Sequence, residues 1–180
     1  MNKIIKENIE YEISQIDKLF NDTKPLFDLC KLKEPDFIEI IASGAIIHSF
    51  YNGVEGIILL IDKGNGENII NNTKWHIDLF ERAFEFTEKR PAIFKKEYKE
   101  DLKDYLSFRH FFRHAYSYNI KWDKLKPLLN NVNNIWEIIK NDINNHIKNT
   151  LQDDDCYKIN NINKHKNNND VSGDQSGCSR

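Results

Sequence analysis

Helical periodicity runs through most of this chain, and it is the feature that most limits the possible folds. Apolar residues recur every three or four positions up to about residue 151, and no stretch alternates apolar and polar residues as a strand would. Only seven glycines and four prolines interrupt the 180 residues. We therefore predict an all-α protein, an up-and-down bundle of about five helices joined by short connections.

The apolar stripes and the helix breakers between them define where the five helices should lie. We predict helices over residues 2–31, with a bend or restart at Pro25, and over residues 36–62, 74–88, 94–118 and 123–151. Gly44, Gly53 and Gly56 fall inside the second of these. Because each glycine costs about 1 kcal/mol relative to alanine in a helix interior, we expect close helix packing to compensate.

The composition changes at Gln152. Residues 152–180 are rich in Asn, Lys and Asp, then in Gly and Ser, and almost none are apolar. Such a segment buries too little surface to offset its ordering entropy. The sequence therefore predicts one helical domain over residues 1–151 and a disordered polar tail over residues 152–180.

The cysteines and the apolar runs indicate the environment of the protein. Cys30, Cys156 and Cys178 are far apart and form no Cys-x-x-Cys pair, which argues against a disulfide framework or a zinc site. The first residues mix acidic and basic side chains and lack the apolar segment of a signal peptide. The longest apolar run, 57–61, is far shorter than the roughly 20 residues that span a bilayer. We expect a soluble cytoplasmic protein without membrane contact, metal or cofactor.

The fourth predicted helix carries the most reactive side chains. Two arginines, two histidines and a tyrosine lie within eight residues: Arg109, His110, Arg113, His114 and Tyr116. A histidine can remove the proton from a ribose 2′-hydroxyl, and an arginine can stabilise the negative charge that develops when the oxygen attacks phosphorus. These groups suffice for cleaving RNA without a metal. The same pattern also fits a solvated or ion-paired helix face.

Helix geometry limits how these groups can cooperate. On a regular helix Arg109 and His114 point about 140° apart, whereas Tyr116 lies near Arg109 at the edge of the apolar stripe. The pair converges if the arginine reaches round, if the helix deforms, or if two copies face each other across a two-fold axis. We favour the last arrangement, a homodimer with a shared cleft.

The pattern Arg109-x4-His114-x-Tyr116 resembles the signature of HepT-like HEPN ribonuclease toxins. Further segments resemble the same family in the same order, and the likeness covers roughly residues 3 to 150: 48–55, Trp75-His76, Arg90-Pro91 and 105–110. The resemblance implies a dimeric HEPN bundle that cleaves RNA endonucleolytically without metal, with Arg109 and His114 as the catalytic pair. It also implies a partner, a minimal nucleotidyltransferase antitoxin that transfers AMP to the motif tyrosine, here Tyr116.

Several residues around the signature have two interpretations. His110 stands where many family members carry a small polar residue, and it is either a hydrogen-bonding equivalent or a second proton carrier. Asn52 and Glu55 either orient Arg109 or the substrate, or face solvent, and Arg113 is a supporting cation. We interpret His48 and His76 as structural. Between residues 95 and 126 nine basic side chains face five acidic ones, which either guides RNA or forms an ordinary solvated face.

Two other functions fit the same residues. HEPN bundles without nuclease activity exist, so the chain could be a non-catalytic binding module or an antitoxin-like partner of a nucleotidyltransferase. A helical bundle of purely structural use is the third hypothesis, and in that case Tyr116 would never be modified.

Overall fold

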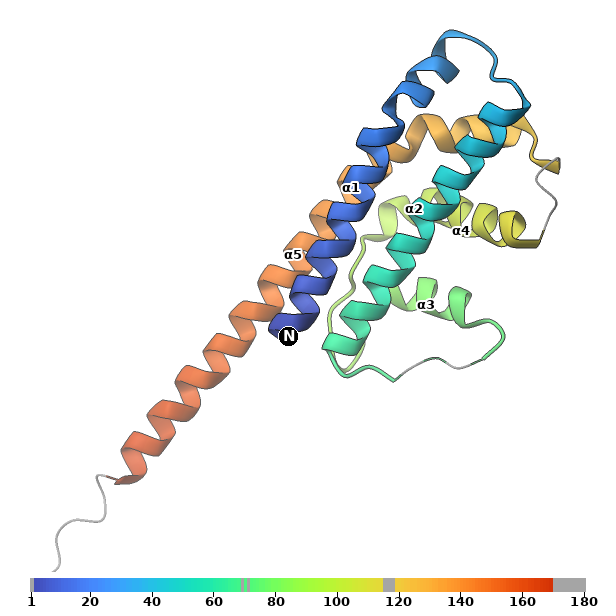
Figure 1. Ribbon diagram of the computed structural model, residues 1–180. Coiled ribbons are helices and arrows are strands. Elements are labelled where there is room, and N and C mark those ends of the chain that lie inside the picture. Colours follow the sequence, from blue (N-terminus) through green and yellow to red (C-terminus); the bar gives the residue numbers. More distant parts are fainter. Residues whose placement is uncertain (1, 69, 71, 115–118, 170–180) are drawn as a thin grey trace, which may run out of the picture.

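Five α-helices and one short 3-10 turn make up the part of the chain described by the computed structural model (Figure 1). The structure describes residues 2–68, 70, 72–114 and 119–169, with only the backbone from residue 151 onward. The helices are α1 (Lys3–Leu32), α2 (Phe37–Gly64), α3 (Trp75–Ala83), α4 (Lys99–His114) and α5 (Trp122–Asn169), and the 3-10 turn η1 (Lys96–Tyr98) precedes α4. The prediction of an all-α bundle of about five helices is confirmed, and the described residues contain no strand.

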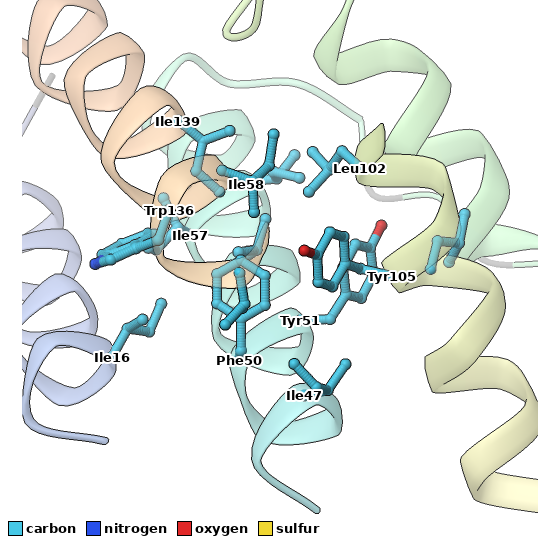
Figure 2. Packing of buried hydrophobic residues seen from close by; sticks show 14 of the residues in the cluster. Ile16, Ile47, Phe50, Tyr51, Ile57, Ile58, Leu102, Tyr105, Trp136 and Ile139 are labelled. Atoms are coloured by element: carbon cyan, nitrogen blue, oxygen red, sulfur yellow. The ribbon is translucent and has the colours of Figure 1, made fainter. Parts of the chain in front are cut away.

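Helix α2 is the centre of the bundle. Its start is defined by a capping box: Glu39 N donates to Asp36 Oδ1 (2.8 Å), and Asp36 N donates to Glu39 Oε2 (2.7 Å). It packs against α1, α3, α4 and α5. Figure 2 shows Phe50 and Tyr51 of α2 between side chains of the neighbouring helices. A helix that is apolar on most of its circumference belongs in such a core.

Helix α2 is also long and apolar enough to cross a membrane. Among the described residues it is the one helix that meets both conditions. More than half of its most apolar 18-residue stretch is buried inside the bundle. The apolar character of α2 is thus accounted for by packing against the other helices.

Two of the three glycines in the interior of α2 lie at close helix contacts. A Cβ on Gly44 would come within 3.1 Å of Phe112 and Ile120, and one on Gly53 within 2.9 Å of Ile16. The predicted compensation by close packing is confirmed at these two positions. At Gly56 it is wrong, since a Cβ there would meet nothing within 4 Å.

Helix α1 is continuous through Pro25, so the predicted alternative of a restart there is wrong, and the bend stays a prediction. Proline removes one backbone hydrogen bond from a helix interior. Phe20 and Phe27 are buried on either side of it, with ring centroids 6.0 Å apart. Packing of Phe20 and Phe27 in the core therefore stabilises the turns before and after Pro25 as one helix.

Tertiary contacts make α3 and α4 shorter than predicted. α3 ends at Ala83, not near residue 88, because the chain folds back and Ala83 O accepts hydrogen bonds from Ile93 N (2.8 Å) and Phe94 N (3.0 Å). α4 begins at Lys99, not near residue 94, and is described as far as His114. Residues 115–118, the predicted end of this helix, lie outside the described residues.

Helix α5 is longer than predicted. It continues to Asn169, beyond the expected end near residue 151, and Figure 1 shows it extending past the N-terminal end of α1. Residues 152–169 therefore have a helical backbone where the sequence predicts a disordered tail. Low hydrophobicity argues against tertiary burial, but helical hydrogen bonds are local, and residues 152–172 contain no proline or glycine. The boundary of the folded domain stays a prediction.

Candidate active site

Arg109 lies where α4 packs on α2. Its side chain falls at the edge of the apolar stripe of α4 and is buried, with 5% of the residue exposed. Nε donates to Asn52 Oδ1 (3.0 Å) and lies 2.8 Å from Glu55 Oε2. Asn52 and Glu55 are three residues apart on α2, so they share one helix face. The sequence left open whether these two residues orient Arg109 or the substrate, or face solvent, and the structure has both in contact with Arg109.

The other end of the guanidinium has fewer partners. Within the described part of the chain, no hydrogen bond uses either terminal nitrogen of Arg109. Arg109 also lines a pocket between α3 and α4. The arginine is thus held through Nε, while its forked end, the part that binds phosphate oxygens, borders a cavity.

Glu55 connects Arg109 to a residue that sequence reasoning assigned to a structural role. His76 of α3 contacts Glu55, with 2.9 Å between Nδ1 and Oε1. Burial raises the pKa of Glu55 to about 7, although Arg109 and then Arg113 oppose the shift. Burial, followed by the charges of Arg109 and Arg113, lowers the pKa of His76 to about 4. His76 is therefore neutral near pH 7 and donates its Nδ1 proton when Glu55 is ionised.

Asn52 has a second contact that extends the network along α2. Its amide nitrogen donates to His48 Nδ1 (3.2 Å), one helical turn earlier. The His48 ring stacks on Phe112 with centroids 4.9 Å apart. Burial, then Arg109 and Arg113, lowers the pKa of His48. The contact with His48 leaves the carbonyl oxygen of the Asn52 amide toward Arg109. A structural role for His48 stays a prediction.

His110 and His114 lie on the exposed face of α4. Their rings are stacked with a tilt, with centroids 4.7 Å apart, as expected for residues four apart on a helix. Among the described contacts none joins His114 to Arg109. α4 is helical through His114, so one chain does not bring the two predicted catalytic side chains together. His110, in contrast, lines the same pocket as Arg109.

The prediction for the site includes two further residues, Arg113 and Tyr116. Arg113 is exposed, and its charge acts on Glu55, His48 and His76. Tyr116, the predicted modification site, lies outside the described residues. The described residues contain no group of three or more His, Cys, Asp or Glu side chains that could hold a metal ion.

Sequence reasoning missed the contact of His76 with Glu55. Tyr51, on the same helix as Asn52 and Glu55, is fully buried. Its hydroxyl has no hydrogen-bond partner among the described residues. Burial, then Glu55, raises its pKa, while Arg109 lowers it. No periodicity marks His76, because it lies on a different helix from its partner and 21 residues from it.

The helical bundle with a basic and histidine-rich fourth helix matches a known family. A family model described as HepT-like protein matches residues 42–150, more than half of the chain. The chain belongs to the HepT-like family, which is associated with HEPN-type nuclease toxins and toxin–antitoxin systems. Searches of curated proteins and of solved structures returned no match.

Proposed function

We propose that this protein is a metal-independent endoribonuclease, the toxin of a toxin–antitoxin pair, acting on RNA in the cytoplasm. The observation that supports this most is the setting of Arg109. Its guanidinium is held through Nε by Asn52 and Glu55, and its forked end borders a pocket. The next turn of α4 carries the imidazoles of His110 and His114. Such a fixed cation next to proton carriers suits phosphodiester cleavage.

The proposed reaction is transfer of the phosphoryl group within the RNA strand. His114 removes the proton of a ribose 2′-hydroxyl, and the oxygen attacks the adjacent phosphorus. Arg109 stabilises the charge on the pentacoordinate phosphate as the bond to the 5′-oxygen breaks. His110 protonates the leaving oxygen in this proposal, which is supported by the 4.7 Å between the centroids of its ring and that of His114. The products are a 2′,3′-cyclic phosphate and a 5′-hydroxyl, and DNA is inert because it lacks the attacking group.

A homodimer brings the two catalytic side chains together in this proposal. Arg109 points into the bundle while His114 is exposed on the outer face of the same helix. Two copies of α4 facing each other across a two-fold axis supply two arginines and two histidines to one cleft. Each reaction then uses an arginine and a histidine in an arrangement that one helix does not provide.

Control by a partner completes the proposal. A minimal nucleotidyltransferase antitoxin transfers AMP to Tyr116, two residues after His114. The added nucleotide is bulky and negatively charged, so it obstructs the cleft and repels the phosphates of RNA. Mass spectrometry after co-expression with such an enzyme is expected to show an AMP-sized mass gain on Tyr116, and Tyr116→Phe is expected to abolish the gain.

The decisive experiment is cleavage of RNA in the presence of EDTA. Wild-type protein is expected to cut RNA but not a 2′-deoxy substrate of the same sequence. Arg109→Ala and His114→Ala should each reduce the rate by about 10²–10⁴-fold. Lys140→Met, a change of an ion-paired lysine on α5, is the control and should leave the rate unchanged. Undiminished cleavage by both site variants would remove these residues from the mechanism.

Mixing the two inactive variants tests the shared cleft. A heterodimer of Arg109→Ala and His114→Ala subunits retains one arginine and one histidine in the cleft. Partial recovery of cleavage on mixing supports a site built from two chains. An inactive mixture whose subunits are shown to exchange would contradict it.

A second function has one observation in its favour. Arg109 is only 5% exposed and is ion-paired with a buried carboxylate, as a structural arginine would be. This setting suits a non-catalytic HEPN module that binds a nucleotidyltransferase. That function predicts a stable complex with the enzyme, no cleavage of RNA, and no growth inhibition when the chain is expressed alone.

A further inference from the structure

The pocket between α3 and α4 has two chemically different ends. Its volume is about 420 Å³, and apolar surface dominates its walls. Ile77 and Phe80 of α3 and Leu106 of α4 form the apolar part. Arg109, His76 and His110 form the polar part. Pockets of a few hundred Å³ with mostly apolar walls and a few convergent polar groups are the usual binding sites for small ligands.

The charges around this pocket favour an anionic ligand. Besides Arg109, the lining includes Lys74 and Lys103. Glu81 is the one acidic residue that lines it, and its carboxylate is ion-paired with Lys99. At the Arg109 end, Glu55 lies behind the guanidinium, with Oε2 2.8 Å from Nε, and offsets part of its charge. Lys74 and Lys103 add positive charge to the lining, so the surface that a phosphate would meet is more basic than acidic.

The apolar part fits a flat, uncharged group attached to that phosphate. Phe80 is buried, with 1% exposed, and forms an apolar wall, whereas Ile77 is 50% exposed. Proteins that bind single-stranded RNA take unstacked bases into such places, against aromatic and apolar side chains. A nucleotide combines the two chemistries, since its phosphate and its base are joined through a ribose.

We propose that this pocket binds one unstacked nucleotide of the RNA substrate, with the base against Ile77, Phe80 and Leu106 and the phosphate at Arg109. This inference rests on the proposed ribonuclease function and adds a base-binding subsite to it. The subsite lies within one protomer, between α3 and α4, and so differs from the dimer cleft that supplies His114. It gives the enzyme a preference for the base next to the bond that is cut.

Binding of mononucleotides tests the pocket without any need for catalysis. His114→Ala protein is titrated by calorimetry with the four nucleoside 3′-monophosphates and with ribose 5-phosphate, which has no base. At least one nucleotide is expected to bind ten or more times tighter than the sugar phosphate. Adding Ile77→Asn should weaken the binding of that nucleotide about tenfold, because the apolar wall is lost. Adding Ile138→Asn, the same change at a comparably exposed isoleucine on α5, should leave binding unchanged.

Mapping of cleavage sites then ties the pocket to the substrate. Wild-type protein on an RNA of mixed sequence is expected to show a base preference at the cut, which Ile77→Asn flattens and Ile138→Asn retains. Equal binding of nucleotide and sugar phosphate, or an unchanged preference in Ile77→Asn, overturns the subsite even if RNA is cut. Base-dependent binding that Ile77→Asn weakens, in a wild-type protein that cuts no RNA, supports the nucleotide pocket while the ribonuclease proposal fails.

Discussion

Two buried arginines each pair with a carboxylate of α2, yet their surroundings differ. Arg90 donates from Nε to Asp62 (2.7 Å) and from its two terminal nitrogens to the carbonyl oxygens of Pro91 and Arg82, both at 3.1 Å. Arg109 donates from Nε to Asn52, and among the described residues its terminal nitrogens make no hydrogen bond. Asp62 and Glu55 are seven residues apart, two turns of the same helix.

Arg90 stabilises the fold, whereas the position of Arg109 is fixed by the residues around it. Arg90 ties the segment after α3 to α2, and Arg82 adds a second ion pair to the same Asp62. Each nitrogen of Arg90 has a protein acceptor, and its side chain is fully buried, so no ligand can reach it. Arg109 borders the α3–α4 pocket, and the network of Asn52, Glu55 and His76 fixes its position. We therefore interpret Arg90, whose nitrogens all have acceptors, as a structural arginine, and Arg109, whose terminal nitrogens have none among the described residues and which lines a pocket, as a candidate site residue.

The largest effect on stability is expected at Arg90. Arg90→Ala removes an ion pair and leaves buried carbonyl oxygens without donors, which should cost about 3–5 kcal/mol of unfolding free energy. Urea denaturation followed by circular dichroism measures the loss. If Arg90→Ala lowered the unfolding free energy by less than about 1 kcal/mol, Arg90 would not be a structural arginine of the kind described here.

A smaller loss of stability is expected at Arg109. Arg109→Ala should cost about 1–2 kcal/mol, because burial already raises the pKa of Glu55 to about 7. Without the arginine that carboxyl can take up a proton and keep its contact with His76. The same urea titration compares both variants. Arg109→Ala should lose RNA cleavage although its fold stays intact. Equal destabilisation by Arg90→Ala and Arg109→Ala would contradict the idea that the fold tolerates loss of Arg109.

Glu55 and His76 in the Arg109 network make the free energy of unfolding depend on pH in opposite directions. The folded pKa of Glu55, about 7, exceeds its ordinary value of 4.5, so stability is lost as pH rises from 4.5 through 7. The folded pKa of His76, about 4, is below its ordinary 6.5, so stability is lost as pH falls from 6.5 through 4. The two trends oppose each other over the shared window.

Glu55→Gln should remove the first trend and leave the second. Relative to wild type, the variant should gain stability as the pH is raised from 5 to 7. Since one pKa unit corresponds to about 1.4 kcal/mol, the relative gain should exceed about 1 kcal/mol. Urea midpoints at four or five pH values give the curves, and parallel curves for the two proteins would sink this account of Glu55.

The smallest effect is expected at a partly exposed pair. Lys140 Nζ contacts both carboxylate oxygens of Asp17, and the two side chains are 26% and 35% exposed. Exposed pairs contribute little, so Lys140→Met should change the unfolding free energy by less than about 1 kcal/mol. Its melting temperature should stay close to that of wild type. A loss as large as that of Arg90→Ala would show that burial does not explain the comparison.

Much of the bundle follows from local patterns, and the exceptions follow from tertiary contacts. The apolar spacing and the Asp36 capping box place α2 almost where the sequence predicts it. The end of α3 was misplaced because the chain after Ala83 is held by hydrogen bonds to residues 93 and 94. Such bonds join positions ten residues apart, so no helical period reports them. The long α5 was missed because polar composition was taken as a sign of disorder.

The candidate site divides in the same way. The residue types and their spacing on α4 indicate Arg109, His110 and His114 as a chemical group, and the family likeness adds Tyr116 and a partner. Packing of α3 and α4 on α2 decides that Arg109 is buried, that Asn52 and Glu55 hold it, and that His76 joins them. Periodicity within one helix can indicate which face a side chain occupies. It cannot identify the partners that face it from other helices, because those contacts exist only after the bundle has closed.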